Sequence, residues 1–245
     1  MNHGYLVFGG IAVVAFVATV FITRVQTLNR LAIKIASLRK AAAEAHTYVP
    51  LGSEDSRSEE QKRRYDVESR ELADNGFSSL GDVREQGSSG ISAGVIRWFA
   101  GLDGRVCGWF AVMPTRQGPT TVRFLFSESA TAEGFFITYS GPTKIKVTQP
   151  PTIQRGQIPV ELGLAAAVAR HQELTAASGG GLRTVGTLEE AIEVLRRLRV
   201  ASQAWRAAQP YDSLLTSDLH LILGPRFDQL AEPMRRRLRK LECVA

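Results

Sequence analysis

The chain has 245 residues, of which 44% are hydrophobic and 22% are charged, with 30 Lys and Arg against 24 Asp and Glu. This composition excludes a chain that is disordered throughout, a collagen-like repeat and a disulfide-rich scaffold. The length suits one large domain or two average ones. The two cysteines are expected to stay reduced, as they do in a cytoplasmic compartment.

An uncharged apolar run at residues 5–23 predicts a transmembrane helix. Its 19 residues would rise about 28 Å as a helix, close to the roughly 30 Å hydrocarbon core of a bilayer. The alternatives are a buried core helix and a cleaved signal peptide. A signal peptide has a basic segment before the run and small residues at a cleavage site after it, and this sequence has neither. We therefore expect an uncleaved signal-anchor helix preceded by a short tail, residues 1–4.

Basic residues that follow the apolar run predict its orientation. The positive-inside rule places the chain after residue 23 in the cytoplasm and the N-terminal tail outside. This predicts a single-pass protein of the plasma (inner) membrane. The same side chains are expected to contact anionic lipid headgroups. They are Arg24, Arg30, Lys34, Arg39 and Lys40.

Residues 24–48 are predicted to form a juxtamembrane amphipathic helix. Its apolar residues recur at three- and four-residue steps, which places them on one side of a helix. They are Val25, Leu28, Leu31, Ile35 and Leu38. Two interpretations stay open. The helix can lie on the bilayer, or it can form a coiled-coil seam through residues 25–46 that joins two copies of the chain.

Residues 49–58 are predicted to be a linker, and residues 59–245 are predicted to form a cytoplasmic α+β domain. A charged helix is expected to begin at the capping pattern of Ser56 and Glu59 and to end at Asn75-Gly76. After this helix, residues 81–90 are predicted to be a loop because Gly and Ser punctuate them.

Alternation of apolar and polar residues over about 92–148 predicts an antiparallel meander of about five strands, the last at residues 144–147. Asp103-Gly104 is typical of a hairpin turn. Helices are predicted over about 159–241, and a second capping box, Thr187 with Glu190, begins one of them. The expected fold is α+β: an antiparallel sheet packed with C-terminal helices and tethered by a helical stalk to the transmembrane helix.

Aromatic residues are concentrated in the predicted sheet and indicate a binding surface. Adjacent aromatic pairs place rings on both faces of a strand, so helices on one face only would leave an apolar patch exposed on the other. Helices on both faces are the alternative, and the sequence does not decide between them. The residues expected to contact a protein partner or an apolar ligand are Trp98, Trp109, Phe124, Phe126, Phe135 and Tyr139.

The sequence contains no recognisable catalytic, metal-binding or phosphate-binding motif. Cys107 and His171 can be paired as nucleophile and base, but a buried thiol and a hydrogen-bonded core histidine are the simpler interpretation. Glu128 and Glu133 can be paired as carboxylates, but they flank a predicted hairpin, where polar residues are normal. No cofactor and no metal are expected.

A basic run near the C-terminus holds five cations within six residues. It can complement the end of a helix, bind the membrane surface that holds the N-terminus, or bind nucleic acid. Nucleic-acid binding is not expected, because no set of stacking aromatics or known module accompanies the run. The residues assigned to the membrane surface are Arg235, Arg236, Arg237, Arg239 and Lys240.

Together these features predict a single-pass membrane-anchored protein whose cytoplasmic domain is a binding or interaction module. Its expected partners are the lipid bilayer and a protein. Two alternatives stay open: an enzyme that acts at the membrane surface on a lipid-derived substrate, and a membrane scaffold that oligomerises through residues 25–46.

Overall fold

The computed structural model describes residues 23, 25–37, 39, 46–51, 57–87, 95–115, 118–131, 134–141, 147–176 and 181–242. They fall into two compact units, which we call the sheet unit, Glu44–Pro210, and the helical unit, Met1–Ala43 with Tyr211–Ala245. Residues 5–22 of the predicted transmembrane helix lie outside the described residues. Within the described part of the chain, no helix is both long enough and apolar enough to cross a membrane.

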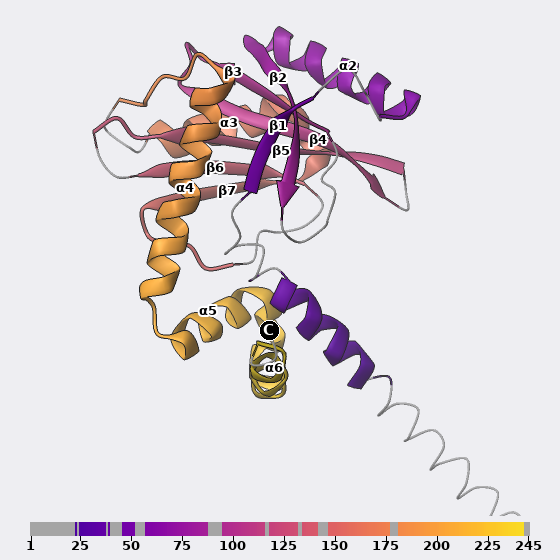
Figure 1. The fold of residues 1–245 in the computed structure, drawn as a ribbon, viewed down its shortest axis with the longest axis vertical. Helices are drawn as coiled ribbons and strands as arrows, with labels where there is room; N and C mark the ends of the chain where they lie inside the picture. Colours follow the sequence, from indigo (N-terminus) through magenta and orange to yellow (C-terminus); the bar gives the residue numbers. More distant parts are fainter. Residues whose placement is uncertain are drawn as a thin grey trace, which may run out of the picture. The chain divides into compact units, whose positions relative to one another are not determined.

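The sheet unit contains a seven-stranded mixed sheet whose strands lie side by side in sequence order (Figure 1). Neighbouring strands pair antiparallel from β1 to β6, and β7 runs parallel to β6. The α+β class is therefore confirmed, with a mixed sheet in place of an antiparallel meander. The strands are β1 (His46–Pro50), β2 (Phe77–Gly87), β3 (Val95–Gly101), β4 (Val106–Thr115), β5 (Gly118–Glu128), β6 (Phe135–Ser140) and β7 (Ile153–Ile158).

The strands β3 to β6 correspond to four of the predicted strands. The turn between β3 and β4 lies at the predicted position, where Asp103 and Gly104 have φ angles of 57° and 75°. Positive φ is what makes Asp-Gly a favourable turn pair. The predicted strand at residues 144–147 is not confirmed: Val147 lies outside any strand, and residues 142–146 lie outside the described part.

The sequence does not predict β1, β2 or β7. β2 replaces most of the predicted loop at residues 81–90, because it pairs with β1 on one side and with β3 on the other. Backbone hydrogen bonds, which need no apolar alternation, hold it in the sheet. β1 lies where the juxtamembrane helix is predicted to end, and β7 lies beyond the predicted end of the sheet at residue 148.

Three helices complete the sheet unit: α2 (Glu59–Asp74), α3 (Gly163–Ala176) and α4 (Leu188–Ala208), with a 3-10 turn η1 (Val160–Leu162) before α3. The capping box of α4 forms as predicted. The start of α2 differs from the prediction, because Ser58 rather than Ser56 is its N-cap and Gln61 completes the capping box. Asn75 ends α2 as predicted.

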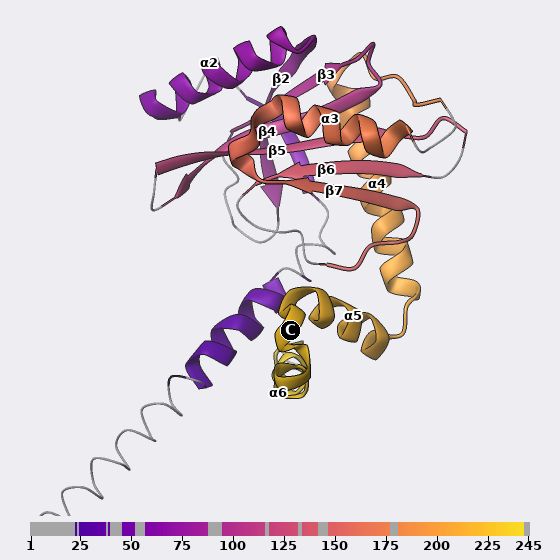
Figure 2. The ribbon, with the colours of Figure 1, turned by 180° about the vertical axis from the view of Figure 1, so that it is seen from behind.

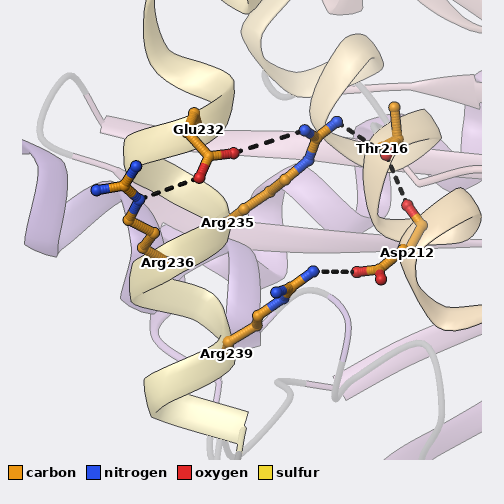
Figure 3. A pocket seen from close by; sticks show the side chains of 6 residues that line it. All are labelled: Asp212, Thr216, Glu232, Arg235, Arg236 and Arg239. Carbon is orange, nitrogen blue, oxygen red and sulfur yellow. Dashed lines mark hydrogen bonds and ion pairs between the residues drawn. The ribbon is translucent and has the colours of Figure 1, made fainter.

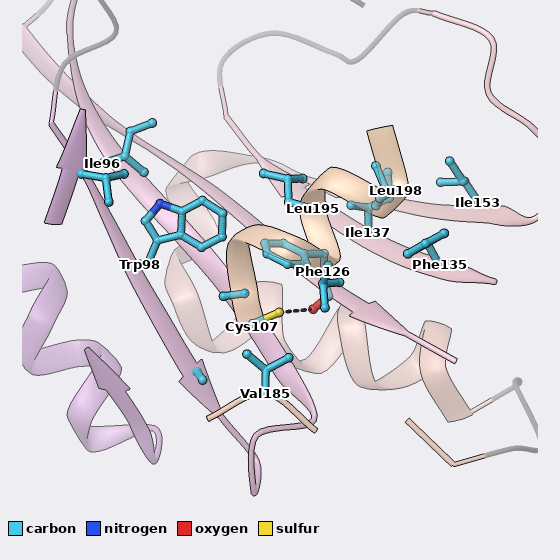
Figure 4. Packing of buried hydrophobic residues seen from close by; sticks show 14 residues of the cluster. Ile96, Trp98, Cys107, Phe126, Phe135, Ile137, Ile153, Val185, Leu195 and Leu198 are labelled. Atoms are coloured by element: carbon cyan, nitrogen blue, oxygen red, sulfur yellow. Dashed lines mark hydrogen bonds between the residues drawn. The ribbon is translucent and has the colours of Figure 1, made fainter. Parts of the chain in front are cut away.

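Helices pack on both faces of the sheet, and α4 covers its face only in part. α4 packs on one face, and α2 and α3 pack on the other (Figures 1 and 2). Along β5, Phe126 is buried on the α4 face and Leu125 on the opposite face, as strand alternation requires. Leu195 and Leu198 of α4 lie over Phe126 and Ile137 (Figure 4).

A buried ion pair holds α2 against the sheet. Arg123 of β5 donates two hydrogen bonds to Glu68 of α2, at 2.6 and 2.9 Å, and both side chains are 6% exposed. Glu71, one turn later in α2, accepts the backbone N–H of Leu164 at 2.8 Å and so contacts the start of α3. Because a buried charge without its partner is strongly destabilising, this pair fixes where α2 docks.

The helical unit consists of residues 25–37, α5 (Tyr211–Leu223) and α6 (Phe227–Glu242), with a 3-10 turn η2 (Gly224–Arg226) between α5 and α6. Of the apolar stripe predicted for residues 24–48, Leu28, Leu31 and Ile35 thus pack within the chain. The last two helices, α5 and α6, belong to a different unit from the sheet. The buried residues of the shared core are Leu28, Ala32, Ile35, Leu215, Leu219, Leu223, Met234 and Leu238.

Glu68→Gln should destabilise the sheet unit by about 3 kcal/mol or more, since it leaves the Arg123 charge buried without its partner. Glu59→Gln is the matched control in the same helix, because the Glu59 side chain is 81% exposed, and its effect should be below about 1 kcal/mol. All three tryptophans lie in the sheet unit, so urea unfolding followed by tryptophan fluorescence measures both variants. Equal losses would contradict the role given to the buried pair.

Candidate functional site

Four of the predicted aromatic residues form a row across four neighbouring strands, which we call the aromatic ladder. Trp98 pairs in register with Trp109, Trp109 with Phe124, and Phe124 with Tyr139. The rings of Trp109 and Phe124 stack with their centroids 5.4 Å apart and their planes at 14°. Strand alternation places all four side chains on the face of the sheet that α4 partly covers.

Burial decreases along the aromatic ladder. Trp98 is fully buried, whereas Trp109, Phe124 and Tyr139 are half-buried. The other two predicted surface residues, Phe126 and Phe135, are 0% and 7% exposed and belong to the core beneath α4. They are core residues because α4 covers this part of the face. The half-buried end of the ladder is therefore the part of the predicted surface that a partner can contact.

Two donors in the aromatic ladder lack an acceptor. The indole N–H groups of Trp98 and Trp109 are buried and have no hydrogen-bond partner among the described residues. A buried donor left without a partner costs about 1–3 kcal/mol. Because neither nitrogen is exposed to solvent, these donors belong to the packing of the ladder and not to its accessible surface.

His171 of α3 lies in a buried polar network. Its Nε2 lies 2.9 Å from Ser127 Oγ, and its Nδ1 lies 3.1 Å from Thr138 Oγ1. Ser127 Oγ also donates to the carbonyl of Arg105 at 2.7 Å. Because a hydroxyl has one proton, Ser127 must accept from Nε2–H, and Thr138 then donates to Nδ1. The network therefore selects the neutral imidazole with its proton on Nε2.

The geometry of this network does not pair a nucleophile with a free base. Burial lowers the pKa of His171 to about 4, but Nε2 already carries a proton and Ser127 directs its own proton at a carbonyl. Cys107 lies on the opposite face of the sheet, where burial raises the pKa of its thiol and its Sγ donates to the carbonyl of Phe126 (Figure 4). The interpretation of a buried thiol and a core histidine is confirmed.

The carboxylate of Glu128 is held by arginines. Arg197 lies 2.6 Å from it and Arg183 lies 3.1 Å from it, while the predicted second carboxylate, Glu133, lies outside the described residues. Among the residues that the structure describes, no three His, Cys, Asp or Glu side chains are grouped so that they could hold a metal ion.

The basic run of α6 is divided between two sides of the helix, because Met234 and Leu238 turn toward the core of the helical unit. One side faces α5 and lines a pocket of about 280 Å³ (Figure 3), and the other faces residues 25–37 and lines a pocket of about 290 Å³. We call the first the α5-side pocket, lined by Asp212, Thr216, Glu232, Arg235, Arg236 and Arg239, and the second the N-helix groove, lined by Asn29, Ala32, Ile33, Arg237, Lys240 and Leu241.

The cations of the α5-side pocket are paired with carboxylates. Glu232 lies 3.0 Å from Arg236 and 3.8 Å from Arg235, and Asp212 lies 2.7 Å from Arg239 (Figure 3). Three guanidinium groups thus face two carboxylates, which leaves little net charge to attract an anion.

The cations of the N-helix groove have no carboxylate partner among the residues that the structure describes. Arg237 donates to Asn29 Oδ1 at 2.8 Å and to the carbonyl of Pro233 at 3.3 Å. Neither Arg237 nor Lys240 forms an ion pair with any residue in the described part of the chain. Ile33 and Leu241 add apolar surface beside them, with exposed fractions of 56% and 39%. Uncompensated cations next to exposed apolar side chains are typical of a membrane-interface surface.

The basic residues that follow the predicted span have different environments. Arg30 and Lys34 are exposed, as a membrane-surface role requires. Arg39 is instead held inside the helical unit, 2.7 Å from the fully buried Asp218 and over the ring of Tyr211 at 5.4 Å. Arg24 and Lys40 lie outside the described residues.

The N-helix groove is not apparent from the sequence, because the periodicity of each helix describes only its own surface. Ile33 and Leu241 are 208 positions apart (241 minus 33) in the chain, and only the packing of α6 against residues 25–37 brings them to one groove. One residue in the sequence pointed to this groove: Ile33 is apolar but lies outside the apolar stripe of the predicted helix.

His171→Gln should flatten the acid dependence of stability. The pKa of His171 is about 4 in the folded chain and about 6.5 in the unfolded chain. The unfolded chain therefore binds an extra proton between these values, so stability falls as the pH drops through them, by an amount on the order of 3 kcal/mol. The variant lacks this contribution, which urea unfolding from about pH 7 to about pH 4 measures.

The control is His220→Gln, which changes the exposed histidine of α5 without touching the buried network and should leave the acid dependence contributed by His171 in place. A wild-type slope in His171→Gln would show that the buried imidazole is not held neutral.

The structure thus contains two surfaces suited to binding, the half-buried end of the aromatic ladder in the sheet unit and the N-helix groove in the helical unit. Comparison of the chain with protein-family models, with curated proteins and with solved structures finds no match.

Proposed function

We propose that the protein is a single-pass membrane-anchored interaction module. Residues 5–23 hold it in the plasma (inner) membrane, the helical unit binds the bilayer surface, and the sheet unit contacts a partner in the cytoplasm. The observation that carries the proposal is the shared core of residues 25–37 and α6. Through this core, the segment that directly follows the uncharged run packs with the basic C-terminal helix.

Distances along the chain support a membrane-surface role for α6. Arg237 bonds Asn29 at 2.8 Å, and the six residues from Thr23 to Asn29 correspond to about 9 Å of helical rise. The headgroup layer extends about 5–7 Å beyond the hydrocarbon core, so the guanidinium group held at Asn29 lies just outside this layer, within the roughly 8 Å Debye length over which an anionic surface attracts a cation. A cation near an anionic membrane surface contributes about 1 kcal/mol.

The aromatic ladder supports the interaction role of the sheet unit. Trp109, Phe124 and Tyr139 offer half-buried rings that a partner can contact. The two alternatives have less support. The Ser127 and His171 network has no free base for an enzyme, and the apolar stripe that a scaffold would use for oligomerisation is filled by α5 and α6.

Val14→Arg combined with Val17→Arg should release the protein from membranes, because each arginine near the centre of a span costs about 2.5–3.5 kcal/mol. Thr27→Arg with Ser37→Arg is the matched control: it adds the same charge at two exposed positions after the run. Alkaline carbonate extraction followed by sedimentation measures retention. If the first variant stays in the carbonate-resistant pellet, the anchor proposal is wrong.

A photo-crosslinking amino acid at Tyr139 should give a discrete protein adduct in intact membranes, since this ring lies at the half-buried end of the aromatic ladder. The control carries the same crosslinker at Val67, which is 49% exposed on α2 and lies away from the ladder face. Denaturing gels of the irradiated membranes report the adducts. No adduct at Tyr139, or the same adducts at both positions, would argue against the ladder as a specific partner surface.

A further inference from the structure

We infer that the N-helix groove binds one anionic glycerophospholipid, with the phosphate at Arg237 and Lys240 and an acyl chain along Ile33 and Leu241. This inference rests on the proposed membrane anchorage and adds to it a defined site for a single lipid.

The charge distribution of α6 singles out this groove. Arg235, Arg236 and Arg239 are directed at Glu232 and Asp212 on the α5 side. Arg237 and Lys240 occupy the other side and pair with no carboxylate in the described residues. A phosphate in the N-helix groove therefore meets charge that no described residue neutralises, whereas in the α5-side pocket it would compete with two carboxylates.

The position of the Arg237 side chain is already fixed. Its Nε donates to Asn29 Oδ1 at 2.8 Å, and one Nη contacts the carbonyl of Pro233 at 3.3 Å. A guanidinium has five N–H donors, so donors remain for a phosphate. Because the protein holds the side chain in place, less conformational entropy is lost when the lipid binds.

The apolar lining distinguishes a lipid from a soluble anion. Ile33 and Leu241 are 56% and 39% exposed, and they flank the same groove as the two cations. A free phosphate would leave both side chains in water, whereas an acyl chain covers them and removes apolar surface from water. The groove volume of about 290 Å³ suits a phosphate and the first part of one acyl chain.

A third cation lies beside the groove. Arg30 is exposed and precedes Ile33 by three residues, so the two side chains are neighbours on the helix surface. Cations on both helices thus surround the apolar strip, as a negatively charged headgroup favours.

Native mass spectrometry of the full-length chain, released from nonionic detergent micelles, tests the inference. The chain is titrated with dioleoylphosphatidylglycerol, with dioleoylphosphatidylcholine and with glycerol 3-phosphate. We expect one tight phosphatidylglycerol adduct, at least tenfold weaker phosphatidylcholine binding and no glycerol phosphate adduct. Arg237→Gln with Lys240→Gln should weaken phosphatidylglycerol binding by about 30-fold, from two cations of about 1 kcal/mol each.

The matched control is Arg236→Gln with Arg239→Gln, which removes the same charge from the α5 side of the same helix. Both residues are paired with carboxylates, so this variant should change the affinity for phosphatidylglycerol less than about threefold. Arg237→Lys keeps the charge and should retain most of the binding, which separates lost charge from misfolding. Ile33→Ser should weaken phosphatidylglycerol binding without creating a glycerol phosphate adduct. Thermal unfolding followed by circular dichroism verifies that each variant folds.

Three results would overturn the inference: equal losses from the two double variants, equal binding of phosphatidylglycerol and phosphatidylcholine, or a glycerol phosphate adduct as tight as that of the lipid. The first indicates diffuse electrostatic attraction, and the last indicates a site for soluble anions. Each leaves the anchor intact, because membrane retention is measured separately by the Val14→Arg and Val17→Arg variant. If Val14→Arg with Val17→Arg is released from membranes while phosphatidylglycerol and phosphatidylcholine bind equally well, the proposed function is sustained and the lipid site is rejected.

Discussion

Alternating side chains make both faces of the seven-stranded sheet apolar, so both faces must be removed from water by helices. α2 and α3 together cover one face, and α4 alone covers part of the other. The buried core residues, the docking positions of the helices and the half-buried end of the aromatic ladder all follow from this requirement. A sheet with one polar face would have needed only one helical layer.

Two sets of buried polar groups inside the sheet unit specify how its helices pack. The pair of Glu68 and Arg123 fixes α2, and the hydrogen bonds of His171 with Ser127 and Thr138 fix α3 over β5 and β6. Each of these groups has a partner within the core, which is the condition under which a buried polar group does not destabilise a fold. A histidine at the centre of a protein is therefore not by itself evidence of catalysis.

The helical unit shows how one amphipathic helix can present two different surfaces. Its apolar residues turn inward, which leaves a basic run on both remaining sides of α6. Carboxylates from α5 and from α6 itself neutralise one side, and Asn29 contributes only a neutral amide to the other. The same run of cations is thus a structural ion-pair network on one side and a positively charged surface on the other.

The sequence by itself determined the local elements. Strands β3 to β6, the turn at Asp103-Gly104 and the capping box of α4 were predictable, because alternation, turn residues and caps act between residues close in the chain. The aromatic residues of the candidate surface were predictable by type, but which of them are core was not. Burial of Phe126 and Phe135 depends on where α4 docks.

Only the tertiary structure decided the remainder. The polar strand β2 exists because its neighbours supply backbone hydrogen bonds, and the parallel strand β7 because β6 offers it an edge. The split of the chain into a sheet unit and a helical unit also depends on packing between distant segments, since residues 25–37 find their partners in α5 and α6. Local sequence patterns report propensity and periodicity, whereas these features arise from contacts between residues far apart in the chain.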